Sequence, residues 1–307
     1  MKEESRQLRC GFVAVVGRPN TGKSTLVNNI LGKKVAIVSS VPQTTRNKIR
    51  GIYNEKRGQI IFIDTPGLHL AADQLGKYMN ATSAGVIEEA EVIIHLADTR
   101  RQVGREEEFI VARLKRLNKP IILGLNKIDL GGKFLSQYIE LWEKALNKPV
   151  QELTGRLTCV PLSGLTGKNL DALLDEIFRH LPQGEALYPV DMSTDVPQNL
   201  AIAEIIREKF LNLMREEVPF SLAVKVEEVV PRTNKLTYIR AKIIVERESQ
   251  KEIVIGRHAE VLKQAGSLAR EEIERLLNTK VFLETQVVSE KKWRDDPQVL
   301  RELGYVY

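Results

Sequence analysis

The chain has 307 residues, of which 43% are hydrophobic and 28% are charged. At this length two domains are expected rather than one core, and no run approaches the ~18 consecutive apolar residues of a membrane-spanning helix. The acidic, polar start at 1–6 predicts no secretory leader, and Cys10 and Cys159 lack metal-ligand spacing and fit reduced thiols in a cytosolic protein.

The net charge of +6 is unevenly distributed along the chain. Residues 1–190 hold 27 lysines and arginines against 20 acidic residues, whereas residues 191–307 hold 19 against 20. A surface for a polyanion in the second part must therefore arise from the local placement of basic side chains.

The first predicted element is a buried strand over 12–16, which leads into a glycine-rich stretch and then a helical pattern. That order predicts a phosphate-binding loop. Gly17 and Gly22 allow backbone conformations that turn N–H groups onto phosphates. Lys23 adds a positive charge for the terminal phosphates, and the hydroxyl of Ser24 suits Mg²⁺. The expected phosphate-binding residues are Gly17, Arg18, Pro19, Asn20, Thr21, Gly22, Lys23, Ser24 and Thr25.

A polar stretch over 34–50, interrupted by Pro42, predicts a loop. Phosphate-loop GTPases have a switch loop at this place, so Thr44 and Thr45 are candidates for contact with Mg²⁺ and the γ-phosphate. A hairpin is predicted next, with strands over 48–53 and 59–63.

The second hairpin strand ends in the sequence Asp-Thr-Pro-Gly. Asp64 can hold Mg²⁺ through water, and the Gly67 N–H can reach the γ-phosphate because glycine has no side chain to block the approach. Thr65 and Pro66 complete this second phosphate-sensing loop. Loss of the γ-phosphate would release both loops, which predicts a switch.

Two further apolar strands are predicted over 92–97 and 120–125. Apolar runs of this kind, separated by helical patterns, indicate a mostly parallel sheet with helices on both faces, and the fold class is α/β. His95 lies within the first of these strands, where a hydrogen-bonded core histidine is expected rather than a ligand.

The choice of base is expected to fall to Asp129 in the sequence Asn-Lys-Ile-Asp. A carboxylate can accept from the N1–H and the 2-amino group of guanine, and adenine offers neither donor. Asn126 and Lys127 are expected to brace the loop and cover the base. A later loop at Ser163 and Gly164 supplies backbone groups for the guanine O6.

This order of motifs resembles the translation-factor-like GTPases, and the sequences Gly-Arg-Pro-Asn-x-Gly-Lys-Ser and Pro-Gln-Thr-Thr-Arg resemble the Era branch over residues 11–181. The resemblance implies a GTPase in which Ser24, Thr45 and Asp64 hold Mg²⁺. Thr45 and Gly67 would position water and phosphate, and no residue is assigned with certainty as catalytic.

Leu68 departs from the Ras-like pattern, in which a glutamine at this position orients the attacking water. We therefore predict slow hydrolysis that a partner or an added cation accelerates. The same resemblance makes Asn20 and Thr44 candidate ligands for K⁺. For Asn20, a hydrogen bond that braces the loop is an equally weighted alternative.

The second half shows helix, two strands, loop, helix and strand, an order that resembles a type II KH domain. We expect a GTPase domain at 1–182, a linker at 183–198, and a smaller α+β KH domain with a C-terminal extension at 199–307. The predicted helices cover 199–216 and 260–278, and the predicted strands cover 220–226, 236–245 and 281–288.

The sequence Val-Ile-Gly-Arg-His-Ala is similar to the KH loop that clamps about four single-stranded nucleotides. Ala259 replaces the second loop glycine. We expect alanine to exclude a positive φ here, because glycine adopts that conformation at low cost and alanine does not. Trp293 fits either core packing or base stacking, with packing favoured. The expected RNA-binding residues are Gly256, Arg257, His258, Ala259, Lys263, Arg240 and Lys242.

Together the two domains resemble the Era family. That implies a monomeric, cytoplasmic protein that binds GTP or GDP, contacts 16S rRNA near its 3′ end, and acts in small (30S) subunit assembly, with peripheral association at the inner membrane face. Its nucleotide state would set its RNA affinity. Two alternatives stay open: an RNA-binding adaptor with a structural nucleotide, and a regulatory GTPase on a membrane surface.

Overall fold

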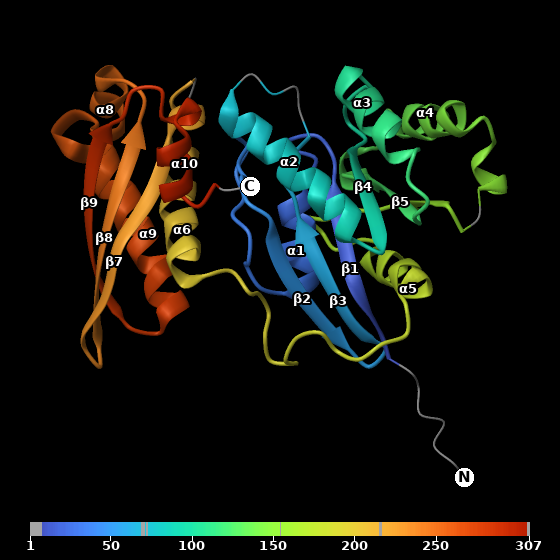
Figure 1. The fold of residues 1–307 in the computed structure, drawn as a ribbon, viewed down its shortest axis with the longest axis horizontal. Coiled ribbons are helices and arrows are strands. Elements are labelled where there is room, and N and C mark those ends of the chain that lie inside the picture. Colours follow the sequence, from blue (N-terminus) through green and yellow to red (C-terminus); the bar gives the residue numbers. More distant parts are fainter. Residues whose placement is uncertain (1–7, 69–70, 72, 154, 215–216, 306–307) are drawn as a thin grey trace, which may run out of the picture. The chain divides into compact units, whose positions relative to one another are not determined.

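The computed structural model describes residues 8–68, 71, 73–153, 155–214 and 217–305, which form two compact units (Figure 1). Unit 1 consists of Met1–Ala36, Thr45–Leu70 and Met79–Asp195. Unit 2 consists of Ile37–Thr44, Ala71–Tyr78 and Val196–Tyr307. Among the described residues, no helix is both long and apolar enough to cross a membrane.

Unit 1 is built on a six-stranded sheet in the order β2-β3-β1-β4-β5-β6. All neighbouring strands run parallel except β2 and β3, which form the predicted hairpin. This confirms the mostly parallel sheet that the apolar runs predicted. The strands are β1 (Arg9–Val16), β2 (Ile49–Glu55), β3 (Gly58–Asp64), β4 (Val92–Asp98), β5 (Ile121–Asn126) and β6 (Leu157–Pro161).

Helices cover both faces of this sheet, because alternate residues of the central strand enter different cores (Figure 1). Val13 and Val15 pack with α1 (Lys23–Leu31) and α5 (Leu170–His180). Ala14 and Val16 belong to the core on the opposite face. The helices of that second face are α2 (Gln74–Glu89), α3 (Arg105–Leu114) and α4 (Leu135–Leu146).

The segment predicted as a linker lies along unit 1 up to Asp195. Gln183 bridges to Arg9, and Thr194 bridges to Gly51 of β2. The side chain of Gln59 accepts from the backbone N–H of Tyr188 at 2.9 Å and donates to its carbonyl at 2.8 Å. These contacts fix the segment onto β1 and the β2–β3 hairpin.

Unit 2 has a three-stranded sheet in the order β7-β8-β9, with β7 and β8 antiparallel and β8 and β9 parallel. Its core joins inward residues of the sheet, such as Ile239 and Ile243, to the helices α6 and α9. The elements are α6 (Gln198–Leu213), α7 (Val218–Ser221), β7 (Ala223–Thr233), β8 (Leu236–Val245), α8 (Glu248–Ile255), α9 (Glu260–Leu277), β9 (Lys280–Ser289) and α10 (Pro297–Glu302).

Two features of unit 2 differ from the sequence prediction. The strand expected from residue 220 begins at Ala223, because a helical turn with Pro219 in its first positions precedes it. Helix α8 was not predicted, since its first turn is polar. Its start is held by Gln250, whose side-chain oxygen accepts from the backbone N–H of Arg247 at 3.0 Å.

Candidate functional site

The phosphate loop connects β1 to α1 and requires glycine at both ends. Gly22 lies in the left-handed region with φ 98°. A Cβ at Gly17 would come within 2.4 Å of the Leu96 carbonyl oxygen. The loop therefore has the backbone freedom that inward-facing N–H groups require, as predicted.

Lys23 is buried at the first position of α1. Its Nζ donates to the carbonyls of Gly17 at 3.2 Å and Arg18 at 2.9 Å. Burial lowers the pKa of Lys23 to about 8, against the opposing charges of Asp64 and Glu107. Bound phosphates would compete for this ammonium group and favour its charged form.

The three residues predicted to hold Mg²⁺ come together in unit 1. The Ser24 hydroxyl donates to Asp64 Oδ2 at 2.6 Å and lies 3.0 Å from the Thr45 hydroxyl. Thr45 Oγ1 lies 3.4 Å from the same carboxylate oxygen. Asp64 Oδ1 is buried and makes no hydrogen bond with any described residue. Converging oxygens with one unsatisfied carboxylate oxygen fit Mg²⁺, which prefers oxygen ligands.

The buried surroundings of Asp64 favour a nearby positive charge. Burial raises the pKa of its carboxyl group, and the charge of Lys23 and the hydroxyls of Ser24 and Thr45 oppose that shift. A divalent cation at this position would offset the cost of burying the carboxylate.

The second phosphate-sensing loop lies against the first. A Cβ at Gly67 would come within 2.7 Å of the Pro19 backbone nitrogen, so only glycine permits this approach. The Thr65 hydroxyl donates to the Val15 carbonyl at 2.8 Å and ties the loop to β1. Leu68 is fully buried in the core formed with α2 and α3 and does not contribute a polar group.

Asn126 connects three loops of the predicted base site. Its side-chain nitrogen donates to the Thr21 carbonyl at 2.7 Å. Its side-chain oxygen accepts from the backbone N–H of Lys127 and of Gly164, each at 2.8 Å. The structure thus brings the phosphate loop, the Asn-Lys-Ile-Asp loop and the Ser163–Gly164 loop together.

Lys127 and Asp98 form a pair that extends this network. Lys127 Nζ donates to Asp98 Oδ2 at 2.8 Å and to the Asn20 carbonyl at 2.7 Å. Burial alone would raise the pKa of Asp98, but hydrogen bonds from Arg100 and Lys127 lower it to about 2. Asp98 was not identified from the sequence as part of the site, although its position at the carboxyl end of β4 could have indicated it.

The remaining predicted nucleotide residues are arranged as follows. Asp129 is exposed in the short turn η1 (Ile128–Leu130). Asn20 has φ 65°, and its carbonyl braces the loop through Lys127. Thr44 belongs to unit 2, where its hydroxyl donates to the Val41 carbonyl at 2.5 Å and its carbonyl accepts from Arg207.

The predicted RNA loop joins α8 to α9. Arg257 and His258 are exposed, and Lys263 Nζ lies 3.3 Å from the His258 carbonyl. His258 and Ala259 have φ of 52° and 59°. The expectation that alanine would exclude a positive φ was therefore wrong: Ala259 adopts the left-handed conformation and is the N-cap residue of α9.

Arg240 and Lys242 lie on the sheet face opposite the helices of unit 2, since the intervening Ala241 is in the core. Lys242 Nζ lies 2.7 Å from Glu227 Oε1. Arg240 pairs with Glu228 and lies 3.3 Å from Glu227. The structure does not bring these two residues to the loop at 256–259, and neighbouring acids offset their charges.

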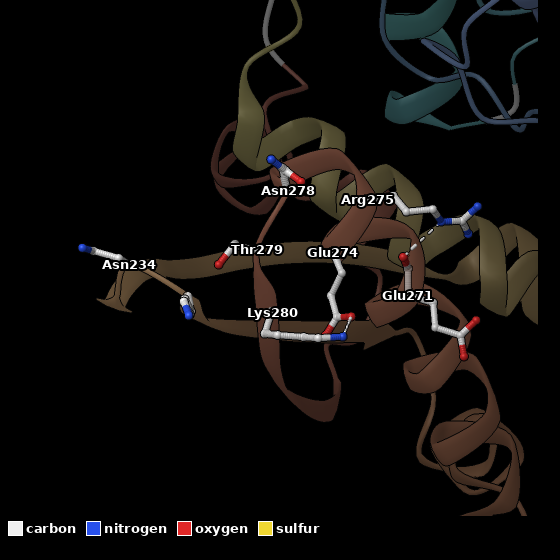
Figure 2. A pocket seen from close by; sticks show the side chains of 8 residues that line it. Asn234, Glu271, Glu274, Arg275, Asn278, Thr279 and Lys280 are labelled. Atoms are coloured by element: carbon white, nitrogen blue, oxygen red, sulfur yellow. Dashed lines mark hydrogen bonds and ion pairs between the residues drawn. The ribbon is translucent and has the colours of Figure 1, made fainter.

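An open hollow of about 550 Å³ lies beside the last turns of α9 (Figure 2). Lys280 Nζ pairs with Glu274 Oε2 at 3.0 Å inside it. Because the predicted RNA loop precedes the first residue of α9, the hollow lies at the other end of that helix. Its lining residues are Asn234, Lys235, Glu271, Glu274, Arg275, Asn278, Thr279 and Lys280.

The structure decides between the alternative roles that the sequence allowed for Trp293 and His95. Trp293 is fully buried, and its indole N–H donates to the Ser221 carbonyl at 2.7 Å, so it packs rather than stacks on bases. His95 is also fully buried, with hydrogen bonds at both ring nitrogens, as expected for a core histidine.

Comparison with known protein families gives two matches. Residues 12–127 match the family described as 50S ribosome-binding GTPase, and residues 217–294 match the KH domain. The chain is 46% identical over 297 residues to GTPase Era of Halothermothrix orenii. That alignment covers 97% of this chain and 98% of that protein. It is 44% identical over 299 residues to GTPase Era of Geobacter metallireducens, with the same two coverages.

Two solved structures have the same fold over nearly the whole chain. One is Era in complex with MgGDPNP and nucleotides 1506–1542 of 16S ribosomal RNA, with a TM-score of 0.90. The other is an Era variant of Aquifex aeolicus bound to GDP and AlF4⁻, with a TM-score of 0.89. Each is 41% identical to this chain and covers 98% of it and 100% of the solved chain.

Proposed function

Because this chain belongs to the GTPase Era family, we propose that it binds and hydrolyses GTP and binds the 3′ region of 16S ribosomal RNA during small ribosomal subunit assembly. The single observation that carries the GTPase part is the convergence of Ser24, Thr45 and Asp64 beside the phosphate loop. The related structure with MgGDPNP and RNA supports both ligands.

The chain's own residues provide the nucleotide site as follows. Backbone N–H groups of the loop at 17–22 receive the phosphates, and Lys23 neutralises their charge. Mg²⁺, when bound, offsets phosphate charge and would be held by Ser24, Thr45 and Asp64. Asn126 fixes the loop on which Asp129 accepts from the guanine base.

Hydrolysis by the free protein is proposed to be slow. The side chain that follows Gly67 is Leu68, which is apolar and buried in the core, so it cannot orient a water. A partner or a monovalent cation would supply that function, with Asn20 as the candidate ligand for K⁺. Hydrolysis that is fast and equal in K⁺ and Na⁺ would contradict this part.

RNA binding is proposed to centre on the loop at 256–259. Exposed Arg257 and His258 offer positive charge to a phosphate backbone next to the N-terminus of α9. Arg240 and Lys242 are left out of this contact because Glu227 and Glu228 pair with them.

The nucleotide state is proposed to set RNA affinity. Thr45 approaches the Mg²⁺ site in unit 1, and the preceding Thr44 belongs to unit 2, so the peptide between them transmits the state of the site along the chain. We further propose a monomer in the cytoplasm, with any membrane association peripheral.

The test uses the full chain and three measurements. Calorimetry should show GTP binding with Mg²⁺ and at least about 100-fold weaker ATP binding. An RNA oligonucleotide with the 3′-terminal 16S sequence should bind more tightly than a scrambled one. Multiple-turnover hydrolysis that the cognate RNA stimulates would separate this function from that of an adaptor with a structural nucleotide. Equal GTP and ATP affinities would contradict the proposal.

A further inference from the structure

Glu107 is a fully buried carboxylate in the first turn of α3, between Glu106 and Glu108. Its Oε2 lies 3.1 Å from His95 Nε2. Its Oε1 lies 3.3 Å from Arg18 Nε in the phosphate loop. A run of three acids normally indicates an exposed helix end, so no local pattern predicts that the middle one contacts the phosphate loop.

His95 fixes Glu107 in one orientation. The Trp142 indole N–H can only donate, and it donates to His95 Nδ1 at 3.1 Å. The hydrogen of the imidazole must then lie on Nε2, which donates to Glu107. Trp142 and His95 are both fully buried, in α4 and β4. Helix α4, strand β4 and helix α3 thus hold one carboxylate oxygen in place.

The other carboxylate oxygen has Arg18 as its compensating charge. Glu107 Oε1 makes no hydrogen bond with any described residue, and its pairing with Arg18 is ionic. Burying a carboxylate in this way is costly, and an apolar residue often serves stability equally well. The acid is therefore better explained by what it does to Arg18 than by its contribution to the core.

Arg18 is also a backbone junction of the phosphate loop. Its carbonyl accepts from Thr21 Oγ1 at 3.1 Å and from Lys23 Nζ at 2.9 Å. Bound phosphates compete for Lys23, so that contact weakens when nucleotide binds. The Arg18 side chain is 11% exposed and pairs with Glu107 of α3, whose charge also acts on Lys23.

We propose that Glu107 is a positioning residue of the nucleotide site, which holds the phosphate loop through Arg18 in the shape that receives the phosphates. The inference rests on the proposed GTP binding. Since the loop contacts phosphates shared by GTP and GDP, loss of Glu107 should weaken both nucleotides equally and leave kcat unchanged.

The test compares Glu107→Gln, Arg18→Met and a matched control, Glu106→Gln, in the full chain. Glu106 is the neighbouring acid, 44% exposed and 3.8 Å from Arg18 Nε. Affinities for GDP and for a non-hydrolysable GTP analogue are measured with fluorescent nucleotides, and kcat and KM in steady state. Glu107→Gln and Arg18→Met should each raise both Kd values and KM about tenfold, and Glu106→Gln less than about twofold.

The double variant Glu107→Gln with Arg18→Met separates positioning from general destabilisation. Because both changes break one interaction, the double variant should bind no more weakly than the worse single variant. Additive losses, unchanged affinities in a folded Glu107→Gln, or an equal effect of Glu106→Gln would overturn the inference.

If Glu107→Gln fails to fold, Arg18→Met decides, because it leaves the Glu107–His95–Trp142 contacts in place. An unchanged Kd in Arg18→Met would then overturn the inference. Normal binding by the wild type alongside unaffected variants would overturn this inference alone. A wild-type chain that bound no guanine nucleotide would instead remove the proposed function on which it rests.

Discussion

Asp129 is the side chain on which we propose that the choice of base depends. It is exposed on a short turn, and the neighbouring Asn126 holds that turn to the phosphate loop and to Gly164. A carboxylate on a braced loop keeps its acceptors fixed relative to the phosphates. We therefore expect discrimination between bases to depend on the chemistry of this carboxylate rather than on loop movement.

Asp129→Asn should change the preferred base. The amide loses one acceptor for the guanine N1–H and 2-amino group, and it gains a donor for the 2-oxo group of xanthine. GTP binding should weaken by about 100-fold, while XTP binding strengthens. Calorimetry with GTP, XTP and ATP measures the change, and unchanged GTP affinity would show that Asp129 does not contact the base.

Ala259 adopts a backbone conformation that suits glycine better. Its φ of 59° is in the left-handed region, which costs an alanine about 1–2 kcal/mol. Ala259→Gly should therefore raise the free energy of unfolding by roughly 0.5–1 kcal/mol, since the greater freedom of the unfolded chain offsets part of the gain. Urea denaturation measures it.

The control for that change is Ala265→Gly, in the helical interior of α9. Ala265 is fully buried and has no positive φ, so glycine there should lower the stability by about 1 kcal/mol. Destabilisation by both substitutions would show that Ala259 carries no backbone strain.

At the scale of elements, the sequence predicted the sheet of unit 1 and its loops well. Apolar runs marked the buried strands, and the motifs lie at the carboxyl ends of β1, β3 and β5, where parallel strands present their loops together. Short-range backbone chemistry determines these features, so local patterns were enough to predict them.

The missed features depend on contacts between distant residues. Glu107 is buried because His95 and Arg18 face it, which no local pattern in the acidic run indicates. Arg240 lies opposite Glu228 in the β7–β8 register, and this pairing follows from the hairpin rather than from either strand. Helix α8 begins with a polar turn that a hydrophobic pattern does not mark.

The basic side chains at the loop between α8 and α9 should determine how RNA binding depends on salt. Replacing Arg257 and Lys263 with alanine should weaken RNA binding and reduce the slope of log K against log salt by about 2, one for each lost phosphate contact. Binding is measured by fluorescence anisotropy at salt concentrations between about 50 and 200 mM.

The matched control replaces Arg240 and Lys242 with alanine. It removes the same amount of charge from unit 2, but from side chains paired with Glu227 and Glu228. The salt slope should stay near the wild-type value. A slope reduced by the control and not by the loop variant would move the RNA contact to the sheet face.

At the scale of the whole molecule, each unit has its own hydrophobic core. Nucleotide binding need not alter either core in order to alter RNA binding, because the junction between Thr44 and Thr45 crosses from unit 2 to unit 1. Coupling would then be a difference in RNA affinity between nucleotide states, and linkage requires the reverse effect to have the same size.

The most direct measurement is RNA affinity in two nucleotide states. The full chain is titrated with the 3′-terminal 16S oligonucleotide in saturating Mg²⁺ with a non-hydrolysable GTP analogue, and again with GDP. The account predicts at least about fivefold tighter RNA binding with the analogue, a difference that Lys23→Ala abolishes. Equal RNA affinity in the two states of the wild type would contradict it.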